Sequence, residues 1–137
     1  MPPPARTLAL SIIEVPFAIV RLASDAPIPG WATSGAIFSV TRTADELSVV
    51  AAEATVPAQQ EASRGWRMLK VHGPFAFSEV GVLASLAGPL AGVGVGIFVI
   101  STFDTDYLLV QQEEIAIAVE ALEHAGHRIS NLKWLTS

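Results

Sequence analysis

The stretch "IFVISTFDTDYLLV", residues 97–110, decides which fold we expect of this chain. Its two ends are rich in β-branched and aliphatic residues, which favour strands. Its middle carries hydroxyl and carboxylate side chains at Ser101, Thr102, Asp104, Thr105 and Asp106. Two apolar runs around a short polar segment predict antiparallel strands at 95–102 and 106–110, joined by a turn. The polar cluster is explained either by the needs of a turn or by a small-molecule site.

The residues that flank this hairpin predict a β-α-β-β-α-β order. The elements are a strand at 66–71, a buried helix at 78–94, the hairpin, an amphipathic helix at 111–126 and a last strand at 127–135. The apolar stripe of the first helix is Val82, Leu83, Leu86 and Leu90, and that of the second is Ile115, Val119 and Leu122. This order is the ferredoxin-like arrangement of the α+β class, an antiparallel sheet with helices on one face.

The first half of the chain is a weaker copy of the second. The segment "AIFSVTRTADELSVV" (36–50) can be aligned with the hairpin sixty residues later, so that Thr41 matches Ser101 and Asp45 matches Thr105. A strand, a polar turn and a second strand recur, which indicates a tandem repeat of two ferredoxin-like units.

The other elements of the first half are short. We expect strands at 8–13 and 17–22, a helical turn within 23–35 and a short helix at 57–63. The predicted units are a degenerate one at residues 1–64 and a complete one at residues 65–137. Whether the strand at 66–71 completes the first unit or opens the second stays open.

Composition excludes several classes of protein. Hydrophobic residues make up 51% of the 137 residues and charged residues 15%, which excludes a disordered chain. The net charge is −5 and the eight basic residues are scattered, so we expect no nucleic-acid binding. The absence of cysteine excludes disulfides and fits a cytoplasmic protein. We expect no metal and no cofactor, because the sequence has no spaced metal motif and no glycine-rich phosphate loop.

One apolar segment is long enough to cross a membrane. Val80–Phe103 contains 24 residues without a charge. It also contains five glycines and Pro89, and its second half is β-branched. A buried helix followed by a buried strand explains the same residues, so we expect no membrane span.

The topology predicts that two distant polar segments meet. In a β-α-β unit the two strands run parallel, so the strands at 66–71 and 95–102 end at the same edge of the sheet. The helix between them begins at that edge. We therefore expect segment 73–81 and turn 101–106 to form one wall of a site.

The chemistry of that wall suits an amino acid. A helix start offers unpaired backbone N–H groups to a carboxylate, and Gly81 allows a ligand to approach the backbone. Ser101 and Thr102 bring hydroxyl groups. Asp104 and Asp106 bring negative charge for an ammonium or guanidinium group.

Three segments resemble the ACT-domain family, in the tandem form of aspartokinase regulatory regions and CASTOR-type amino-acid sensors. They are "FSVTRTADELSVV" (38–50), "GWRMLKVHGPFAFSEVGVLASLAGPLA" (65–91) and "ISTFDTDYLLV" (100–110). The resemblance implies two ACT units, amino-acid binding at an interface between units, a homodimer, and regulation of an enzyme that is not part of the chain.

The resemblance also implies the ligand contacts. They are Phe77, Ser78, Glu79, Val80, Gly81, Ile100, Ser101, Thr102, Asp104, Thr105 and Asp106. One feature departs from the family pattern: the loop Ser78–Gly81 keeps the glycine but lacks the usual Pro-Gly pair. This departure bears on which amino acid binds.

Two other functions stay open. An enzyme would need a positioned base or nucleophile, for which His72 and the pair Asp104 and Asp106 are candidates, although we expect no catalysis. His124 and His127 flank a helix end, where a cation complements the helix dipole. The other function is a homo-oligomeric interaction module without a small ligand, in which exposed strand edges pair between copies.

Overall fold

The computed structural model describes residues 6–76 and 78–136, which form two compact units. One, here called the split unit, combines the residues up to Glu14 with those from Arg67 onward. The other, the inserted unit, is Val15–Trp66. The sequence division at residues 64 and 65 differs from this one, since it assigned residues 1–14 to the N-terminal unit. The reason lies in strand pairing.

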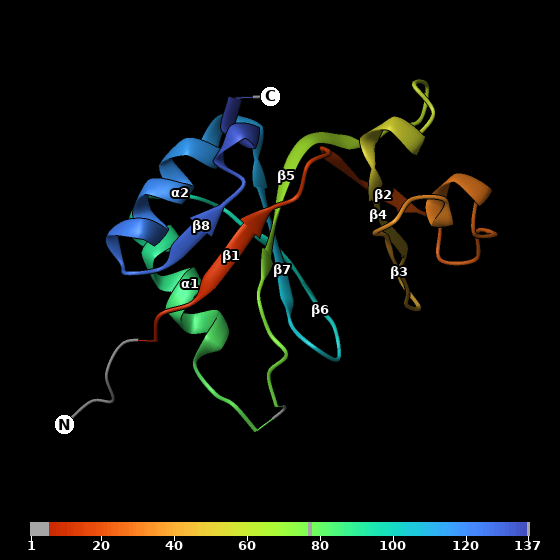
Figure 1. Ribbon diagram of the computed structural model, residues 1–137. Coiled ribbons are helices and arrows are strands. Elements are labelled where there is room, and N and C mark those ends of the chain that lie inside the picture. The colour runs from red at the N-terminus through yellow and green to blue at the C-terminus, as the bar shows by residue number, and fades with distance from the viewer. Residues whose placement is uncertain (1–5, 77, 137) are drawn as a thin grey trace. The chain divides into compact units, whose positions relative to one another are not determined.

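The split unit contains the expected β-α-β-β-α-β order (Figure 1). Its elements are β5 (Ser63–Val71, which enters this unit at Arg67), α1 (Val82–Gly92), β6 (Phe98–Ser101), β7 (Asp106–Gln111), α2 (Ile115–His124) and β8 (Arg128–Ser130). The strand β1 (Ala9–Ile12) adds to this set. It pairs antiparallel with β5, as in Leu10 opposite Val71, and parallel with β8. The strand order is therefore β6-β7-β5-β1-β8, and β1 lies beside β5, where a ferredoxin-like unit places its last strand.

The inserted unit has the same order without α-helices. Its elements are β2 (Phe17–Leu22), the 3-10 helix η1 (Gly30–Thr33), β3 (Ser39–Arg42), β4 (Leu47–Ala52), the 3-10 helix η2 (Glu53–Thr55) and the first residues of β5. The strand order is β3-β4-β2-β5. Thus β5 both ends the inserted unit and begins the split unit, which answers the question that the sequence left open.

The helix predicted at 57–63 is wrong. The segment forms a turn instead, and β5 begins at Ser63. Nη2 of Arg64 binds the carbonyl oxygens of Pro57 and Gln60, both at 2.9 Å. These contacts, with the hydrogen bond from the Gln60 N–H to the Pro57 carbonyl at 3.0 Å, hold the segment as a turn.

The repeat is present, but its spacing is one residue shorter than predicted. Arg42 pairs with Leu47 in one hairpin and Ser101 with Asp106 in the other, so equivalent residues are 59 apart rather than sixty. Both turns start with a threonine whose N–H binds a carbonyl three residues on: Thr43 binds Glu46 at 2.9 Å, and Thr102 binds Thr105 at 2.8 Å. Because successive side chains of a strand point to opposite faces of the sheet, the predicted alignment matched residues that lie on opposite faces.

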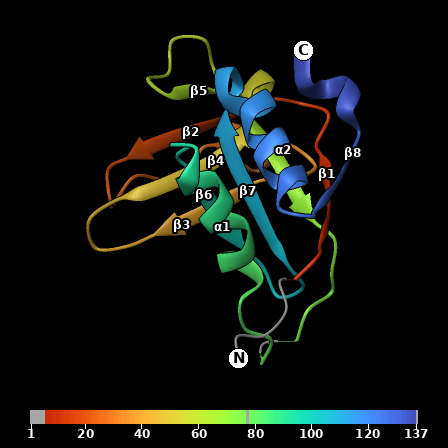
Figure 2. The ribbon, with the colours of Figure 1, turned by 90° about the vertical axis from the view of Figure 1, so that its left-hand side faces the viewer.

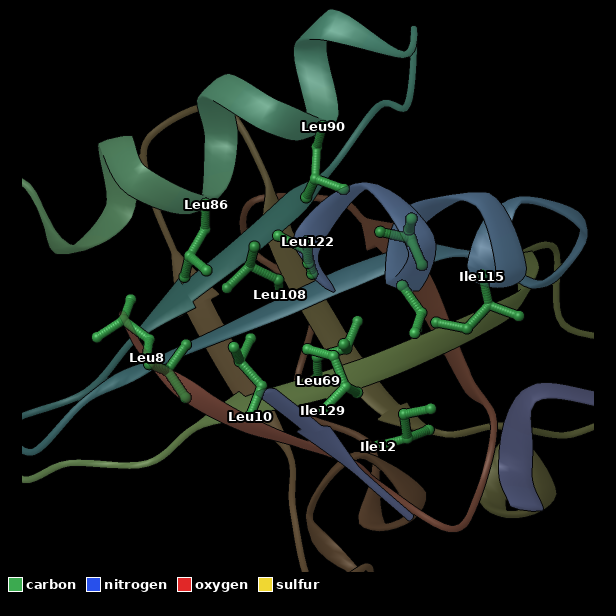
Figure 3. Packing of buried hydrophobic residues seen from close by; sticks show 14 of the residues in the cluster. Leu8, Leu10, Ile12, Leu69, Leu86, Leu90, Leu108, Ile115, Leu122 and Ile129 are labelled. Atoms are coloured by element: carbon green, nitrogen blue, oxygen red, sulfur yellow. The ribbon is translucent and has the colours of Figure 1, made fainter. Parts of the chain in front are cut away.

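Both helices of the split unit cover the same face of its sheet (Figures 1 and 2). Leu86 and Leu90 of α1 and Leu122 of α2 point toward strand residues such as Leu10 and Leu108 (Figure 3). Full burial of such a side chain contributes about 1.5–3 kcal/mol, so this layer is the main source of the unit's stability. The inserted unit has a core of its own, formed by Ala18, Val20, Ala32, Leu47, Val49, Ala51 and Val56.

The helices are shorter than predicted. Helix α1 begins at Val82, not at residue 78, because Gly81 has a positive φ of 82° and lies outside the helix. Leu83, predicted in the apolar stripe, is 37% exposed. The predicted apolar stripe of α2 is correct. The last strand ends at Ser130 instead of at residue 135, and a 3-10 helix (Leu132–Thr136) follows it.

The uncharged segment 80–103 is divided between α1 and β6. Within the part of the chain that the structure describes, no helix is long and apolar enough to cross a membrane.

Arg67 lies where the chain passes from the inserted to the split unit, and its side chain is buried. Nη2 donates to the carbonyl oxygens of Ile13 at 3.0 Å and Glu14 at 3.4 Å, the residues at which the chain leaves the split unit. Desolvation by burial lowers the pKa of the guanidinium. Within the split unit, one side chain thus holds the start of this part of β5 to the residues at which the chain leaves the unit.

His127 does not act as a cation at a helix end, as the sequence suggested. The ring is 4% exposed. Its Nδ1 accepts a hydrogen bond from the Leu8 N–H at 3.1 Å, and its Nε2 donates to the Ser85 carbonyl at 2.9 Å. Pro89 has no N–H for that carbonyl, so the imidazole supplies the donor that the helix lacks. This pattern requires the neutral Nε2–H tautomer.

We predict that His127→Phe lowers the free energy of unfolding by about 2–4 kcal/mol, because it leaves the buried Leu8 N–H and the partly buried Ser85 carbonyl without partners. The loss should be smaller in a Pro89→Ala background, where the new N–H can bind Ser85. Urea denaturation of the four proteins of this cycle measures the coupling, with His124→Phe, at an exposed position, as the control. Equal losses in both backgrounds would contradict the role given to Pro89.

Candidate functional site

The loop after β5 lies against the turn between β6 and β7, as the topology predicted. The N–H of Phe75 donates to the carbonyl of Asp104 at 2.8 Å. The hydroxyl of Thr105 donates to the carbonyl of Val71 at 2.6 Å. The two segments are thus held together by direct hydrogen bonds although they are about thirty residues apart in sequence.

This contact requires glycine at position 73. A Cβ atom there would lie 2.9 Å from the Asp104 carbonyl oxygen and 3.1 Å from the Phe75 nitrogen. Cβ atoms do not approach backbone oxygens so closely, so any other residue would push the loop away from the turn.

The turn is ordered by its own polar side chains. The hydroxyl of Ser101 donates to Oδ1 of Asp106 at 2.6 Å, across the last paired position of the hairpin. Oγ1 of Thr102 binds the carbonyl of Thr105 at 3.0 Å and accepts from its N–H at 3.3 Å. The Thr105 side chain is buried, and its hydroxyl makes the hydrogen bond to the Val71 carbonyl. Part of the polar cluster therefore builds the turn itself.

The loop and the turn enclose a pocket of about 280 Å³, here called the rim pocket. It is lined by Phe75, Ala76, Glu79, Val82, Ser101, Thr102, Phe103, Asp104, Thr105 and Asp106. The lining contains three carboxylates and no lysine, arginine or histidine. Coulombic attraction therefore favours a cationic group in the rim pocket.

Glu79 joins the loop to the N-terminal segment. Its Oε1 accepts a hydrogen bond from the Ala76 N–H at 3.3 Å, and its Oε2 lies 3.0 Å from Nη1 of Arg6. Both charged side chains are about one-third exposed, with 37% for Arg6 and 35% for Glu79.

The structure brings together part of the predicted ligand-binding set. Glu79, Ser101, Thr102, Asp104, Thr105 and Asp106 line the rim pocket. Ser78, Val80, Gly81 and Ile100 do not, and Phe77 lies outside the described residues. Gly81 is the N-cap of α1, and no side chain caps this helix.

Sequence reasoning missed four lining residues, namely Phe75, Ala76, Val82 and Phe103. Phe103 is 78% exposed in the middle of the predicted turn. An aromatic residue at such a position is the signal that could have identified it. Nothing in the sequence indicated that Arg6 contacts a pocket residue, because it is 73 residues away from Glu79.

His72, the candidate base of an enzyme, does not line the rim pocket. Its Nε2 is 2.9 Å from the hydroxyl of Ser11. No group of three potential metal ligands occurs among residues 6–76 and 78–136.

Comparisons with known proteins agree with this fold and assign part of the chain to a family. A family model described as the ACT domain matches residues 61–124, and a model of an N-terminal domain matches residues 16–59. The crystal structure of protein Atu0741 from Agobacterium tumefaciens is 41% identical, with a TM-score of 0.86. The match covers 91% of this chain and 93% of that one.

Two further comparisons cover regulators. "Cytosolic arginine sensor for mTORC1 subunit 1" from Rattus norvegicus is 44% identical over 59 residues, which is 42% of this chain and 18% of that protein. The regulatory subunit of aspartate kinase from Thermus flavus is 13% identical with a TM-score of 0.57, over 88% of this chain and 97% of that one, and shows a shared fold.

The chain is thus an α+β protein built from tandem ferredoxin-like units. Residues 61–124 match the ACT-domain family, and the chain is similar to a CASTOR-type arginine sensor and shares its fold with an aspartate kinase regulatory subunit.

We predict that Gly73→Ala lowers the free energy of unfolding by about 1–3 kcal/mol, because the new methyl group collides with a backbone oxygen that cannot yield. Denaturant unfolding measures the loss. Gly96→Ala is the matched control, since a Cβ at that position meets nothing within 4 Å. Equal stability of the two variants would show that the loop is not held against the turn.

Proposed function

We propose that this protein is a non-catalytic regulator that binds a free amino acid in the rim pocket. The observation that carries the proposal is the joining of an ACT-domain loop and turn into one pocket lined by three carboxylates and two exposed hydroxyl-bearing residues. A volume of about 280 Å³ is just below the roughly 300–1,000 Å³ typical of sites for drug-sized ligands, which favours a small ligand.

The charge of the lining favours an amino acid with a cationic side chain. Asp104 and Asp106 are acceptors for ammonium or guanidinium groups, and Phe103 is an aromatic residue of the lining. The similarity to a protein named as an arginine sensor supports this preference, although the alignment covers 18% of that protein.

The proposal also covers the oligomeric state of the protein and its location in the cell. We propose a homodimer that acts in the cytoplasm and regulates an enzyme. The name of the curated relatives includes "cytosolic", and the aligned chain of Thermus flavus is a regulatory subunit. Sedimentation equilibrium measures the mass in solution, and a monomer at all concentrations would remove the homodimer from the proposal.

A groove between α1 and α2 favours the second function, an interaction module without a small ligand. It has a volume of about 700 Å³ and is lined by Pro89, Gly92, Val93, Ile117, Glu120, Ala121, His124 and Ala125. Val93 and Ile117 are both more than 40% exposed, as expected where apolar side chains meet a partner.

We predict that a thermal-shift screen of the twenty amino acids finds a few that raise the melting temperature. A ligand at 100 times its Kd stabilises by about 2.7 kcal/mol, which moves the midpoint by several degrees. Asp104→Ala should abolish the shift. Asp45→Ala is the matched control, because Asp45 occupies the equivalent position of the other turn. No shift with any amino acid would favour the interaction module.

We predict that Asp106→Asn weakens binding of L-arginine or L-lysine about tenfold, because a charge-assisted hydrogen bond becomes neutral, and weakens binding of neutral amino acids less. Isothermal titration calorimetry measures both affinities. Asp25→Asn, at an exposed position of the inserted unit, controls for net charge. Equal losses for basic and neutral ligands would show that Asp106 acts on the turn and not on the ligand's charge.

A further inference from the structure

The pocket carboxylate Glu79 is already bound by a cation of the chain itself. Among residues 6–76 and 78–136, the pair of Arg6 and Glu79 is the only salt bridge, with 3.0 Å between Nη1 and Oε2. Glu79 lines the rim pocket and Arg6 does not. The guanidinium of Arg6 therefore takes one oxygen of a carboxylate that a ligand in the pocket could also use.

The other oxygen of Glu79 is also engaged. Oε1 accepts the Ala76 N–H at 3.3 Å, within the loop that forms the pocket wall. Displacing Arg6 would therefore free Oε2 for a ligand while Oε1 continues to hold the loop. The ion pair is about one-third exposed on each side, and pairs of this kind are weak enough to open readily.

We propose that Arg6 is an internal competitor that sets the affinity of the rim pocket for cationic ligands. The proposal rests on the function proposed above. A ligand cation that binds Oε2 of Glu79 must first displace the guanidinium of Arg6. The measured affinity is then the intrinsic affinity multiplied by the fraction of molecules in which this pair is open.

The competition makes a prediction that depends on ligand charge. Arg6→Gln removes the competing charge and keeps a polar side chain of similar reach. L-arginine should bind Arg6→Gln about two- to sixfold more tightly than the unchanged protein, given the usual strength of exposed ion pairs. L-citrulline has nearly the shape of arginine without its charge, so its affinity should not change.

Isothermal titration calorimetry with the whole chain tests this, using L-arginine and L-citrulline as probes. Arg128→Gln is the matched control, because it removes one positive charge from an exposed residue of β8 in the same unit. In a Glu79→Gln background, Arg6→Gln should give no gain, since the carboxylate for which the two cations compete is absent.

The outcomes separate the two proposals. If L-arginine binds the unchanged protein but Arg6→Gln binds it equally or less tightly, competition by Arg6 is wrong and amino-acid binding stands. An equal gain for L-citrulline, for Arg128→Gln or in the Glu79→Gln background would likewise overturn it. If L-arginine binds none of these proteins, the preference for a cationic amino acid fails, and the role of Arg6 fails with it.

Discussion

The contact between the loop after β5 and the β6–β7 turn is the constraint on which the candidate site depends. Two hydrogen bonds make it, from the Phe75 N–H to Asp104 and from the Thr105 hydroxyl to Val71. Each uses a backbone carbonyl, so the loop and turn are fixed relative to the strands that lead into them. The rim pocket lies beside this contact and is lined by residues of both segments.

The sharing of β5 explains why the domain organisation was hard to read. This strand ends the inserted unit and begins the split unit, so a division between residues 64 and 65 cuts one strand. The place beside β5 is then taken by β1, from the other end of the chain. Arg67 holds the part of β5 in the split unit to Ile13 and Glu14, at the cost of burying a guanidinium.

The two turns of the repeat show how one local structure can serve different purposes. Thr43 and Thr102 head turns with the same backbone hydrogen bond. Asp45 and Asp104 occupy equivalent positions, but only the second turn meets a loop that leads into an α-helix. In the inserted unit a 3-10 helix replaces that α-helix, so the two turns lie in different surroundings.

The order of strands and helices, the core positions of α2 and the residues of the hairpin turn could be read from the sequence, because hydrophobic periodicity and turn chemistry are local properties. The ACT-domain resemblance, the convergence of loop and turn, and six of the lining residues could be predicted as well. The position of β1, the role of His127 and the pairing of Arg6 with Glu79 could not. Each joins residues more than forty positions apart, and no local pattern encodes such a contact. Only the closing of the sheet around one core brings these partners within bonding distance.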